Sequence, residues 1–319
     1  MIRWGFLGAG WIAQTALAPA LHAANNSTLH AVASRDTERS AALNPTRIHQ
    51  RYEDLLDDPE IDAVYINLSN EAHYQWTIAA LAAGKHVLCE KPLALNHAQA
   101  QKMADAAKKH NRVLTEAVWH QWHPRFVRIR ELIKRGDLGA LTSIDSSFCF
   151  TGNFENNYRL DPQKGGGSLL DVGVYQVHVW SALNPQNGVV NIQSVDCTMS
   201  ATGVDMTTQV SAALGNGVRV KALSSFEMPE TQSLVISTEQ ATVECLGNDA
   251  FTSWNKPSSM RIGNQIEEFA PVDPYRLMVE NFSDHISGKP AWTLGLDQSL
   301  YVSQVLDQIK EFRLSDELF

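Results

Sequence analysis

The sequence MIRWGFLGAGWIA at residues 1–13 decides the fold, because a short apolar strand runs directly into a glycine-rich turn. Gly8, Gly10 and Ala13 have the spacing G-x-G-x-x-A. In such a turn Gly8 permits a tight bend, Gly10 removes the Cβ that would block phosphates, and Ala13 keeps the next helix close to the strand. Glycine pairs also occur in purely structural turns, but a strand in front of this spacing favours a dinucleotide-binding site.

Short apolar segments alternate with helical ones over residues 1–118. Strands are expected at 2–7, 29–33, 63–68, 86–89 and 113–118, and helices at 12–24, 37–43, 52–56, 72–83 and 97–110. Strands separated by helices form βαβ units with a parallel, doubly wound sheet. The pattern predicts an α/β dinucleotide-binding domain over residues 1–119.

The pattern changes in the second half of the chain. We expect helices at 124–134, 168–183, 274–287 and 297–312, a strand at 141–150 and several strands between 189 and 269. Consecutive strands joined by hairpins form an antiparallel or mixed open sheet, and such a sheet needs cover on its faces. We predict a second α/β domain at 120–319, which binds the substrate. We also predict that a homodimer or homotetramer forms through its sheet.

Composition limits the classes of partner. The chain has 319 residues, 44% of them hydrophobic, and a formal net charge of −9. A nucleic-acid-binding protein needs a concentrated basic face, so we expect no nucleic acid partner. No apolar run approaches the roughly 20 residues that cross a bilayer, and no charged leader precedes the first strand, so we expect a cytoplasmic protein and no membrane partner. The four cysteines form no C-x-x-C pair, which gives no sign of zinc or a redox dithiol.

The segment Glu90-Lys91-Pro92 directly follows the predicted strand at 86–89. In an open α/β sheet the carboxyl ends of the strands face the ligand crevice, so Lys91 can reach the reacting end of a bound nicotinamide. Glu90 would hold or desolvate the ammonium group, and Pro92 fixes the backbone after it. The alternative is a surface salt bridge at a strand end, which the position in this sheet makes less favoured.

A second segment, Gly165-Gly166-Gly167, leads into the long helix predicted at 168–183. Asp171, Tyr175 and His178 stand at i, i+4 and i+7, so in an α-helix they share one face. An amphipathic helix normally turns such residues to water. On a largely apolar helix, an aspartate, a phenol and an imidazole in one row instead indicate a cleft.

Taken together, these segments resemble the glucose–fructose oxidoreductase / inositol dehydrogenase / MocA (Gfo/Idh/MocA) family of NAD(P)-dependent enzymes. The resemblance covers nearly the whole chain and is strongest at 8–13, 70–73, 84–93, 116–124 and 165–178. It implies a Rossmann domain followed by an α/β domain with an open, mostly antiparallel sheet. Lys91 falls on the family's catalytic lysine in E-K-P, and Asp171 and Tyr175 fall on its D-x-G-x-(H/Y) motif. The cofactor-binding residues that follow are Gly8, Gly10, Trp11, Ile12, Ser34, Arg35, Leu68, Ser69, Asn70, His73, Glu90 and Lys91.

The chain departs from the family pattern at three places. Leu68-Ser69 stands where Thr-Pro is usual, Gln121 replaces a frequent arginine, and Tyr175 replaces the histidine of inositol-type dehydrogenases. The tyrosine is similar to that of dihydrodiol dehydrogenases and some sugar ketoreductases, so it disfavours inositol as the substrate.

Hydride transfer from an alcohol needs a group that takes the hydroxyl proton. A free tyrosine ionises near pH 10, and a nearby ammonium group favours its phenolate form. We hypothesise that Tyr175 is the acid/base and that Lys91 tunes it and polarises the substrate oxygen. Alternatively, Lys91 itself relays the proton. Asp171 would orient Lys91 or a sugar hydroxyl, and His178 would bind a second hydroxyl.

The end of the second strand bears on the choice of cofactor. An acidic residue there binds the ribose 2′-hydroxyl, whereas an arginine can pair with a 2′-phosphate. Ser34-Arg35 therefore favours NADP, while Asp36, one position further on, keeps NAD possible.

The substrate is expected to be sugar-like, with polar contacts from Asn157 and Arg159 and a stacking surface from Trp119. Trp122 and Phe154 could also stack, and core packing is an equally supported alternative for the tryptophans. His120 and His123 have a possible metal spacing but no nearby carboxylate or cysteine, so we expect no metal. Two rival functions remain open: a catalytically inactive NAD(P)-binding regulator and an NAD-dependent glycosidase.

Overall fold

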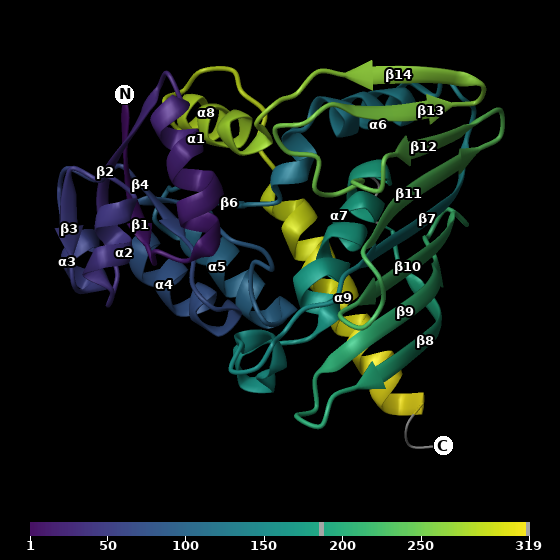
Figure 1. Cartoon of the computed structure of the whole chain (residues 1–319), viewed down its shortest axis with the longest axis horizontal. Coiled ribbons are helices and arrows are strands. Elements are labelled where there is room, and N and C mark those ends of the chain that lie inside the picture. The colour runs from purple at the N-terminus through teal and green to yellow at the C-terminus, as the bar shows by residue number, and fades with distance from the viewer. Residues whose placement is uncertain (185–187, 317–319) are drawn as a thin grey trace. The chain divides into compact units, whose positions relative to one another are not determined.

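The computed structural model describes residues 1–184 and 188–316, and Figure 1 shows the arrangement of their elements. The chain divides into two compact units. Met1–Trp119 and Asp273–Ser299 form the first unit, and His120–Val272 with the chain from Leu300 onward form the second. The division falls within the last helix, α9 (Leu296–Asp316).

The first unit contains a parallel sheet of six strands. Their order is β3-β2-β1-β4-β5-β6, with β1 (Ile2–Leu7), β2 (Ser27–Ala33), β3 (Arg47–His49), β4 (Ala63–Ile66), β5 (His86–Cys89) and β6 (Leu114–Glu116). The strand order reverses beside β1, which is the switch point of a doubly wound sheet. The α/β fold predicted for this half is confirmed.

Helices connect these strands as the alternation predicts. They are η1 (Ala13–Leu17), α1 (Ala18–Ala23), α2 (Thr37–Ala42), α3 (Tyr52–Leu56), α4 (Asn70–Ala82) and α5 (His97–Lys109). Asn96 caps α5, because its side chain accepts a hydrogen bond from the Gln99 amide at 2.9 Å. The strand β3 was not predicted, since its Arg-Ile-His sequence is short, mostly exposed and lacks an apolar pattern.

The helix α8 (Pro274–Ile286) packs in the first unit, although its residues lie in the range we predicted as the second domain. Its anchor is Trp4, which is fully buried and donates a hydrogen bond from Nε1 to the Ser283 hydroxyl at 3.1 Å. The Trp4 ring also lies 5.2 Å from the Phe282 ring. A tertiary contact across most of the chain places this helix, and local sequence carries no sign of it.

The second unit contains a mixed sheet of eight strands in the order β14-β13-β12-β11-β7-β10-β9-β8. β7 and β10 pair in parallel, and the other neighbours pair antiparallel. The strands are β7 (Leu141–Cys149), β8 (Asn191–Met199), β9 (Asp205–Ala213), β10 (Arg219–Ser225), β11 (Thr231–Thr238), β12 (Thr242–Leu246), β13 (Ser258–Ile262) and β14 (Gln265–Phe269). The predicted open, mostly antiparallel sheet is confirmed.

Helices α6 (Pro124–Arg135) and α7 (Val174–Leu183) lie on one face of this sheet (Figure 1). Alternate residues of the central strands are buried on that face, such as Ile144 and Ile236, which have no exposed area. Short helical turns at η2 (Trp119–Trp122), η3 (Tyr158–Leu160), η4 (Pro162–Lys164) and η5 (Leu169–Gly173) complete the element order.

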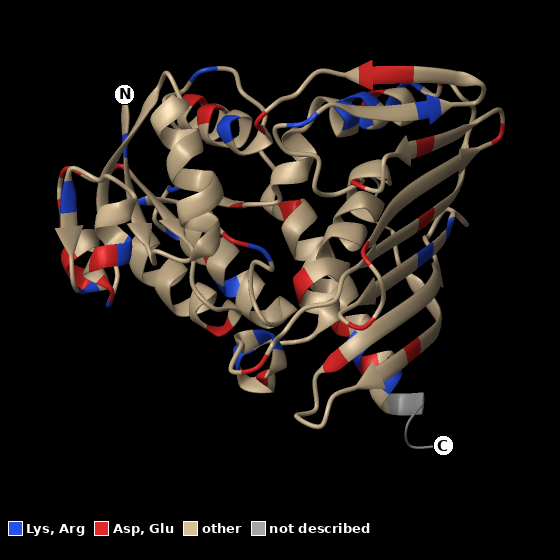
Figure 2. Ribbon diagram, viewed as in Figure 1, with Lys and Arg blue, Asp and Glu red and all other residues tan. Residues whose placement is uncertain are grey.

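Figure 2 shows Lys, Arg, Asp and Glu scattered over both units, while several elements, such as α1 and α7, carry none of them. In the second unit one ion pair is deeply buried: Arg125 Nη1 lies 2.8 Å from Asp249 Oδ1, and both side chains are nearly inaccessible. Among the residues that the structure describes, no helix combines the length and apolar character needed to cross a membrane.

Candidate functional site

The glycine turn after β1, at the start of the first helix, packs closely against Asn67. Gly8 has φ +96°, and a Cβ there would lie 2.3 Å from the Asn67 carbonyl oxygen. A Cβ on Gly10 would lie 3.1 Å from Asn67 Nδ2. The helix is continuous from Trp11 through η1 to α1, and η1 is a π-helical segment of the kind that often marks functional sites. Glycine is therefore required at position 8 by its backbone conformation and the Asn67 carbonyl oxygen, whereas a Cβ at position 10 would need only a small shift of the Asn67 side chain.

Asn67 is a residue of this turn that the sequence analysis missed. It follows β4, and its Nδ2 atom is buried without a hydrogen-bond partner among the described residues. An orphaned donor beside Gly10 fits a phosphate or ribose oxygen, because buried donors otherwise cost free energy. A polar residue at the end of the strand next to β1 was the available signal. Trp11, beside Gly10, exposes 71% of its surface.

After β2, the Arg35 side chain is exposed and the Asp36 side chain caps the next helix. Asp36 caps α2, since its Oδ1 accepts a hydrogen bond from the Arg39 amide at 3.0 Å and its Oδ2 pairs with Arg39 Nε at 3.1 Å. Burial raises the pKa of the Tyr52 phenol, and the nearby Arg35 charge lowers it by a smaller amount. A carboxylate held by its own helix is poorly placed for a ribose diol, whereas the Arg35 guanidinium faces solvent.

Glu90 and Lys91 follow β5 in a buried, hydrogen-bonded setting. Glu90 is 8% exposed, and its Oε1 accepts a hydrogen bond from the Tyr65 hydroxyl at 2.7 Å. Burial raises the pKa of the Glu90 carboxyl, while the Lys91 charge and the Tyr65 hydrogen bond lower it. The ammonium group thus lies within electrostatic reach of a buried carboxylate, as the E-K-P segment predicts. The Lys91–Pro92 peptide bond is cis.

His73 joins the two loops that carry the predicted cofactor residues. Its ring is fully buried, with Nδ1 2.8 Å from the Pro92 carbonyl oxygen and Nε2 3.1 Å from that of Leu68. Burial lowers the pKa of His73, so the ring is neutral near pH 7 and donates to one carbonyl at a time. In this unit His73 therefore ties the E-K-P segment to the loop after β4. Ser69, in that loop, donates to Glu71 Oε1 at 2.7 Å.

The second candidate segment lies in the second unit and is buried on every side. Residues 169–173 form the π-helical turn η5, which continues into α7, and every residue of both is buried. We expected a largely apolar α-helix on which Asp171, Tyr175 and His178 form one row that faces a cleft. The π turn changes the helical phase, and α7 packs against α6, β7 and β10 of its own unit with its residues buried.

Asp205 of β9 closes the N-terminus of η5. Its Oδ2 accepts hydrogen bonds from the Leu169 amide at 2.7 Å and from the Ser168 and Thr208 hydroxyls at 2.8 Å. Gly167 has φ +110°, and a Cβ there would lie 2.1 Å from Asp205 Oδ1. The positive end of this helix is thus neutralised by a carboxylate of the protein.

Asp171 pairs with Arg159 through two contacts. Arg159 Nε lies 2.7 Å from Asp171 Oδ2, and Nη2 lies 3.3 Å from Oδ1. Tyr175 is 6% exposed, and its ring centroid lies 5.3 Å from that of His120 and 5.6 Å from that of Phe148. The structure therefore brings together three predicted residues of one unit, Arg159, Asp171 and Tyr175. It also adds His120 as an unpredicted neighbour, whose pKa burial lowers well below its usual value.

The remaining predicted residues have packing roles in their own units. Trp119 stacks on Tyr275, with 4.6 Å between ring centroids, and Phe154 packs 4.8 Å from Phe226. Asn157 accepts a hydrogen bond from the Arg159 amide at 3.0 Å. His178 has no exposed area, and its carbonyl oxygen accepts from Gln121 Nε2 at 3.5 Å. Trp119 is thus buried against another ring, the arrangement expected under the core-packing alternative, and Phe154 is also buried among aromatic rings.

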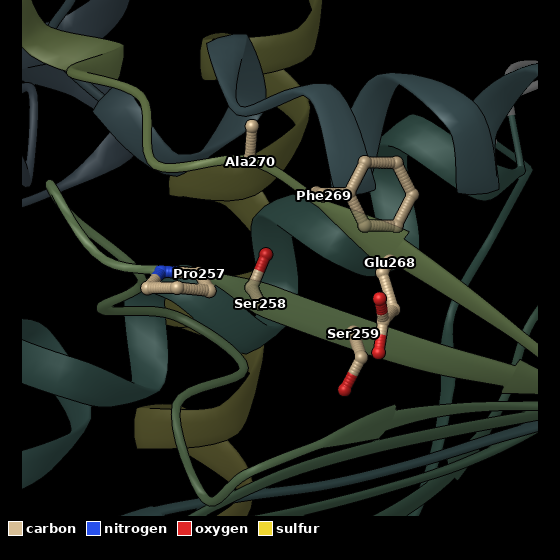
Figure 3. Close-up of a pocket in the computed structure, with 6 residues that line it drawn as sticks. All are labelled: Pro257, Ser258, Ser259, Glu268, Phe269 and Ala270. Carbon is tan, nitrogen blue, oxygen red and sulfur yellow. The ribbon is translucent and has the colours of Figure 1, made fainter.

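Two other features lie apart from these residues. Figure 3 shows a pocket on β13 and β14, lined by Pro257, Ser258, Ser259, Glu268, Phe269 and Ala270. Among the described residues, His30, Asp58 and Glu60 are close enough to hold a metal ion, but Arg47 pairs with both carboxylates and neutralises them. Neither group includes a predicted site residue.

Comparison with known proteins gives matches along almost the entire chain. Residues 2–118 match the family described as "Oxidoreductase family, NAD-binding Rossmann fold", and residues 126–244 match the "GFO/IDH/MocA C-terminal domain". A D-xylose 1-dehydrogenase (NADP(+)) of Haloferax volcanii is 32% identical over 325 residues, covering 97% of each chain. A trans-1,2-dihydrobenzene-1,2-diol dehydrogenase of Mus musculus is 29% identical, covering 85% of this chain and 80% of its own.

Solved structures repeat the fold. A 3-ketoreductase from Actinomadura kijaniata, in complex with NADP and TDP-benzene, has a TM-score of 0.88 at 24% identity, covering 98% of this chain and 97% of its own. An aldose–aldose oxidoreductase from Caulobacter crescentus has a TM-score of 0.87 at 22% identity, covering 99% and 98%. The two family matches and the full-length relative establish that this chain is a member of the Gfo/Idh/MocA family and an NAD(P)-dependent oxidoreductase.

Proposed function

We propose that the protein transfers a hydride between the nicotinamide of NADP(H) and a secondary alcohol or ketone carbon of a sugar-like or polyol substrate. The observation that carries this proposal is the setting of Tyr175, a buried phenol beside an arginine–carboxylate pair. Such a setting suits a group that gains and loses a proton during catalysis. Relatives named as sugar dehydrogenases and sugar ketoreductases support the same substrate class.

The first unit would hold the cofactor at the glycine turn. Gly8 and Gly10 form the turn at which the pyrophosphate would lie, and Asn67 Nδ2 is a donor without another partner among the described residues. Arg35 would pair with the 2′-phosphate of NADP, because the Asp36 carboxylate is engaged in capping α2. When bound, the nicotinamide supplies the hydride acceptor or donor.

The proton would move at the Tyr175 hydroxyl oxygen. In oxidation the phenolate accepts the substrate hydroxyl proton, and in reduction the neutral phenol donates it. Lys91 would polarise the substrate oxygen and favour the phenolate, with Glu90 holding the ammonium group. The alternative, in which Lys91 carries the proton directly, predicts a much smaller effect of removing the phenol hydroxyl.

The experiment is a turnover assay with NADP(H) and NAD(H) over a panel of aldoses, ketoses, polyols, a trans-dihydrodiol and a nucleotide-linked ketosugar. We expect turnover of at least one sugar-like compound, and a loss in kcat of about 10²–10⁴-fold in Y175F. Y301F is the matched control, because the Tyr301 hydroxyl is buried without a hydrogen-bond partner among the described residues, so its removal should leave activity unchanged. Tight NADPH binding without turnover of any panel member would overturn the proposal in favour of a regulatory protein.

Arg35 gives a separate test of the cofactor preference. In R35A we expect the KM for NADPH to rise about tenfold or more, since one charge-assisted contact to the 2′-phosphate is lost. The KM for NADH, which lacks that phosphate, should stay within about twofold and serves as the internal control. Equal affinities of the unsubstituted protein for NADH and NADPH would contradict the NADP assignment.

We also propose that the second unit forms a homodimer or homotetramer through its sheet. The helices α6 and α7 of that unit cover one sheet face, while the other carries partly exposed residues such as Leu223 and Val235. Light scattering after size exclusion should give a mass of two or four chains. A charge at the sheet face, as in V235E, should lower that mass, and a monomer in the unsubstituted protein would refute the assignment.

A further inference from the structure

The guanidinium group of Arg159 is fixed in orientation from two sides. Its fork meets both carboxylate oxygens of Asp171, which is 4% exposed, at 2.7 and 3.3 Å. The guanidinium carbon also lies 4.9 Å from the centre of the Tyr158 ring. A two-point arginine–carboxylate contact fixes direction as well as distance, so this cation is preorganised.

The glycine segment ahead of η5 fixes the backbone of Arg159. The Gly167 amide donates to the Arg159 carbonyl oxygen at 3.0 Å. A Cβ on Gly166 would lie 2.4 Å from the same oxygen, so only glycine allows this approach. Asn157 accepts a hydrogen bond from the Arg159 amide at 3.0 Å. Gly166 and Gly167 therefore allow the backbone of Arg159 to pack closely against the chain that leads into η5.

Tyr175 lies within electrostatic reach of this cation. It follows Asp171 by four residues along the continuous η5–α7 helix. The pKa of Arg159 is raised: burial lowers it, and Asp171, Tyr158 and Tyr175 raise it by more. Asp171 of η5 and His178 of α7 stand on the same helix as Tyr175, the His120 ring of η2 lies 5.3 Å from the Tyr175 ring, and Arg159 of η3 interacts electrostatically with Tyr175.

We infer that Arg159 is a positioning residue that stabilises the phenolate form of Tyr175, and that Asp171 acts by holding Arg159 in place. The inference rests on the proposed function and deepens it. In the oxidation step the substrate C–H bond breaks and its electron pair leaves as hydride to the nicotinamide. The hydroxyl O–H bond breaks at the same time, the proton passes to the Tyr175 phenolate, and the C–O bond becomes a carbonyl. Arg159 exchanges no proton, because a guanidinium stays charged in proteins.

This arrangement explains why a carboxylate stands one turn from a phenol that must ionise. A carboxylate alone would disfavour the phenolate by like-charge repulsion. Paired with Arg159, Asp171 instead holds the positive guanidinium group near Tyr175. Burial keeps His120, the nearest imidazole ring by centroid distance, neutral near pH 7. The local balance at Tyr175 within this unit therefore depends on the Arg159 guanidinium.

The experiment measures the ionisation of Tyr175 itself in the unliganded protein, without any assay of turnover. Protein with ¹³Cζ-labelled tyrosine is titrated by NMR, and Y175F assigns the resonance. We expect R159Q to titrate at higher pH than the unsubstituted protein and R159K to return most of the way, because lysine restores the charge. R128Q is the matched control: Arg128 forms a similar partly buried pair, with Glu267 at 3.2 Å, and should leave Tyr175 unchanged.

A second measurement tests the effect of Arg159 on the rate of substrate oxidation. In the oxidation direction kcat/KM of R159Q at pH 7 should fall about tenfold or more, the factor that a one-unit shift of an acid produces below its pKa. The loss should diminish as the pH is raised. R159M replaces R159Q if the glutamine variant does not fold. An unchanged Tyr175 titration in a folded charge-free variant overturns the inference. Absence of turnover in the unsubstituted protein would overturn the proposed function alone.

Discussion

Gly167 gives the sharpest test of how the continuous η5–α7 helix is held in place. In G167A the new Cβ would lie 2.1 Å from Asp205 Oδ1, at a backbone φ of +110°. The left-handed backbone alone costs roughly 1–2 kcal/mol for a residue with a Cβ. The carboxylate must also move, although its Oδ2 accepts three hydrogen bonds of 2.7–2.8 Å. Losing one bond to a charged group costs about 1.5–3 kcal/mol. We therefore expect a loss in the free energy of unfolding of about 3–5 kcal/mol.

G203A is the matched control for the backbone contribution. Gly203 also has a positive φ, +89°, but nothing lies within 4 Å of its Cβ position. Urea denaturation followed by circular dichroism should give a loss of about 1–2 kcal/mol for G203A. Hydrogen exchange should quicken at the Leu169 amide in G167A but not in G203A. In a D205A background, where no carboxylate is present to be displaced, G167A should cost no more than G203A. Equal losses for G167A and G203A in the unsubstituted background would refute this account of the helix start.

Two further predictions concern buried charge. R125M should lower the free energy of unfolding, measured by urea denaturation, by about 3–5 kcal/mol, because it leaves the Asp249 carboxylate without its principal buried partner. The R125M/D249N double variant should regain most of that loss. Burial lowers the pKa of His86 and of His123 to about 4. Between pH 6.5 and 4 the unfolded chain therefore binds more protons than the folded protein. For each histidine, the free energy of unfolding should fall by about 1.4 kcal/mol for every pH unit of acidification in this range. H123N keeps an acceptor for the Arg125 amide, as His123 Nδ1 is in the unsubstituted protein. At pH 5 this variant should lose on the order of 2 kcal/mol less of its free energy of unfolding than the unsubstituted protein does. An unchanged pH dependence would contradict the assignment to His123.

The sequence predicted the elements that depend on neighbouring residues. The glycine spacing at residues 8–13 placed a tight turn, and the strand at residues 86–89 appears where the pattern put it. These signals are local, because a turn, a cap or an apolar segment is decided by a few adjacent side chains. The polar edge strand β3 carries no such signal, since its hydrogen bonds to β2 and not its side chains make it a strand.

Motif order alone selected Lys91, Asp171 and Tyr175 as candidates. It did not provide their contacts. Asp171 meets Arg159 twelve residues away, and the carbonyl of Arg159 is docked by Gly167. Nothing in the spacing of these residues states that an aspartate on a helix will pair with an arginine in the preceding loop.

What the sequence determined by itself is therefore the family and the two kinds of sheet, and it selected the side chains that we propose as reactive. The tertiary structure decided which charges face one another, that α8 packs on Trp4, that the residues of α7 are buried, and that Asn67 lies beside Gly10. The reason is physical. Backbone conformation follows from local sterics and hydrogen bonding, whereas the partner of a buried polar group is set by which distant segments can pack closely enough to satisfy it.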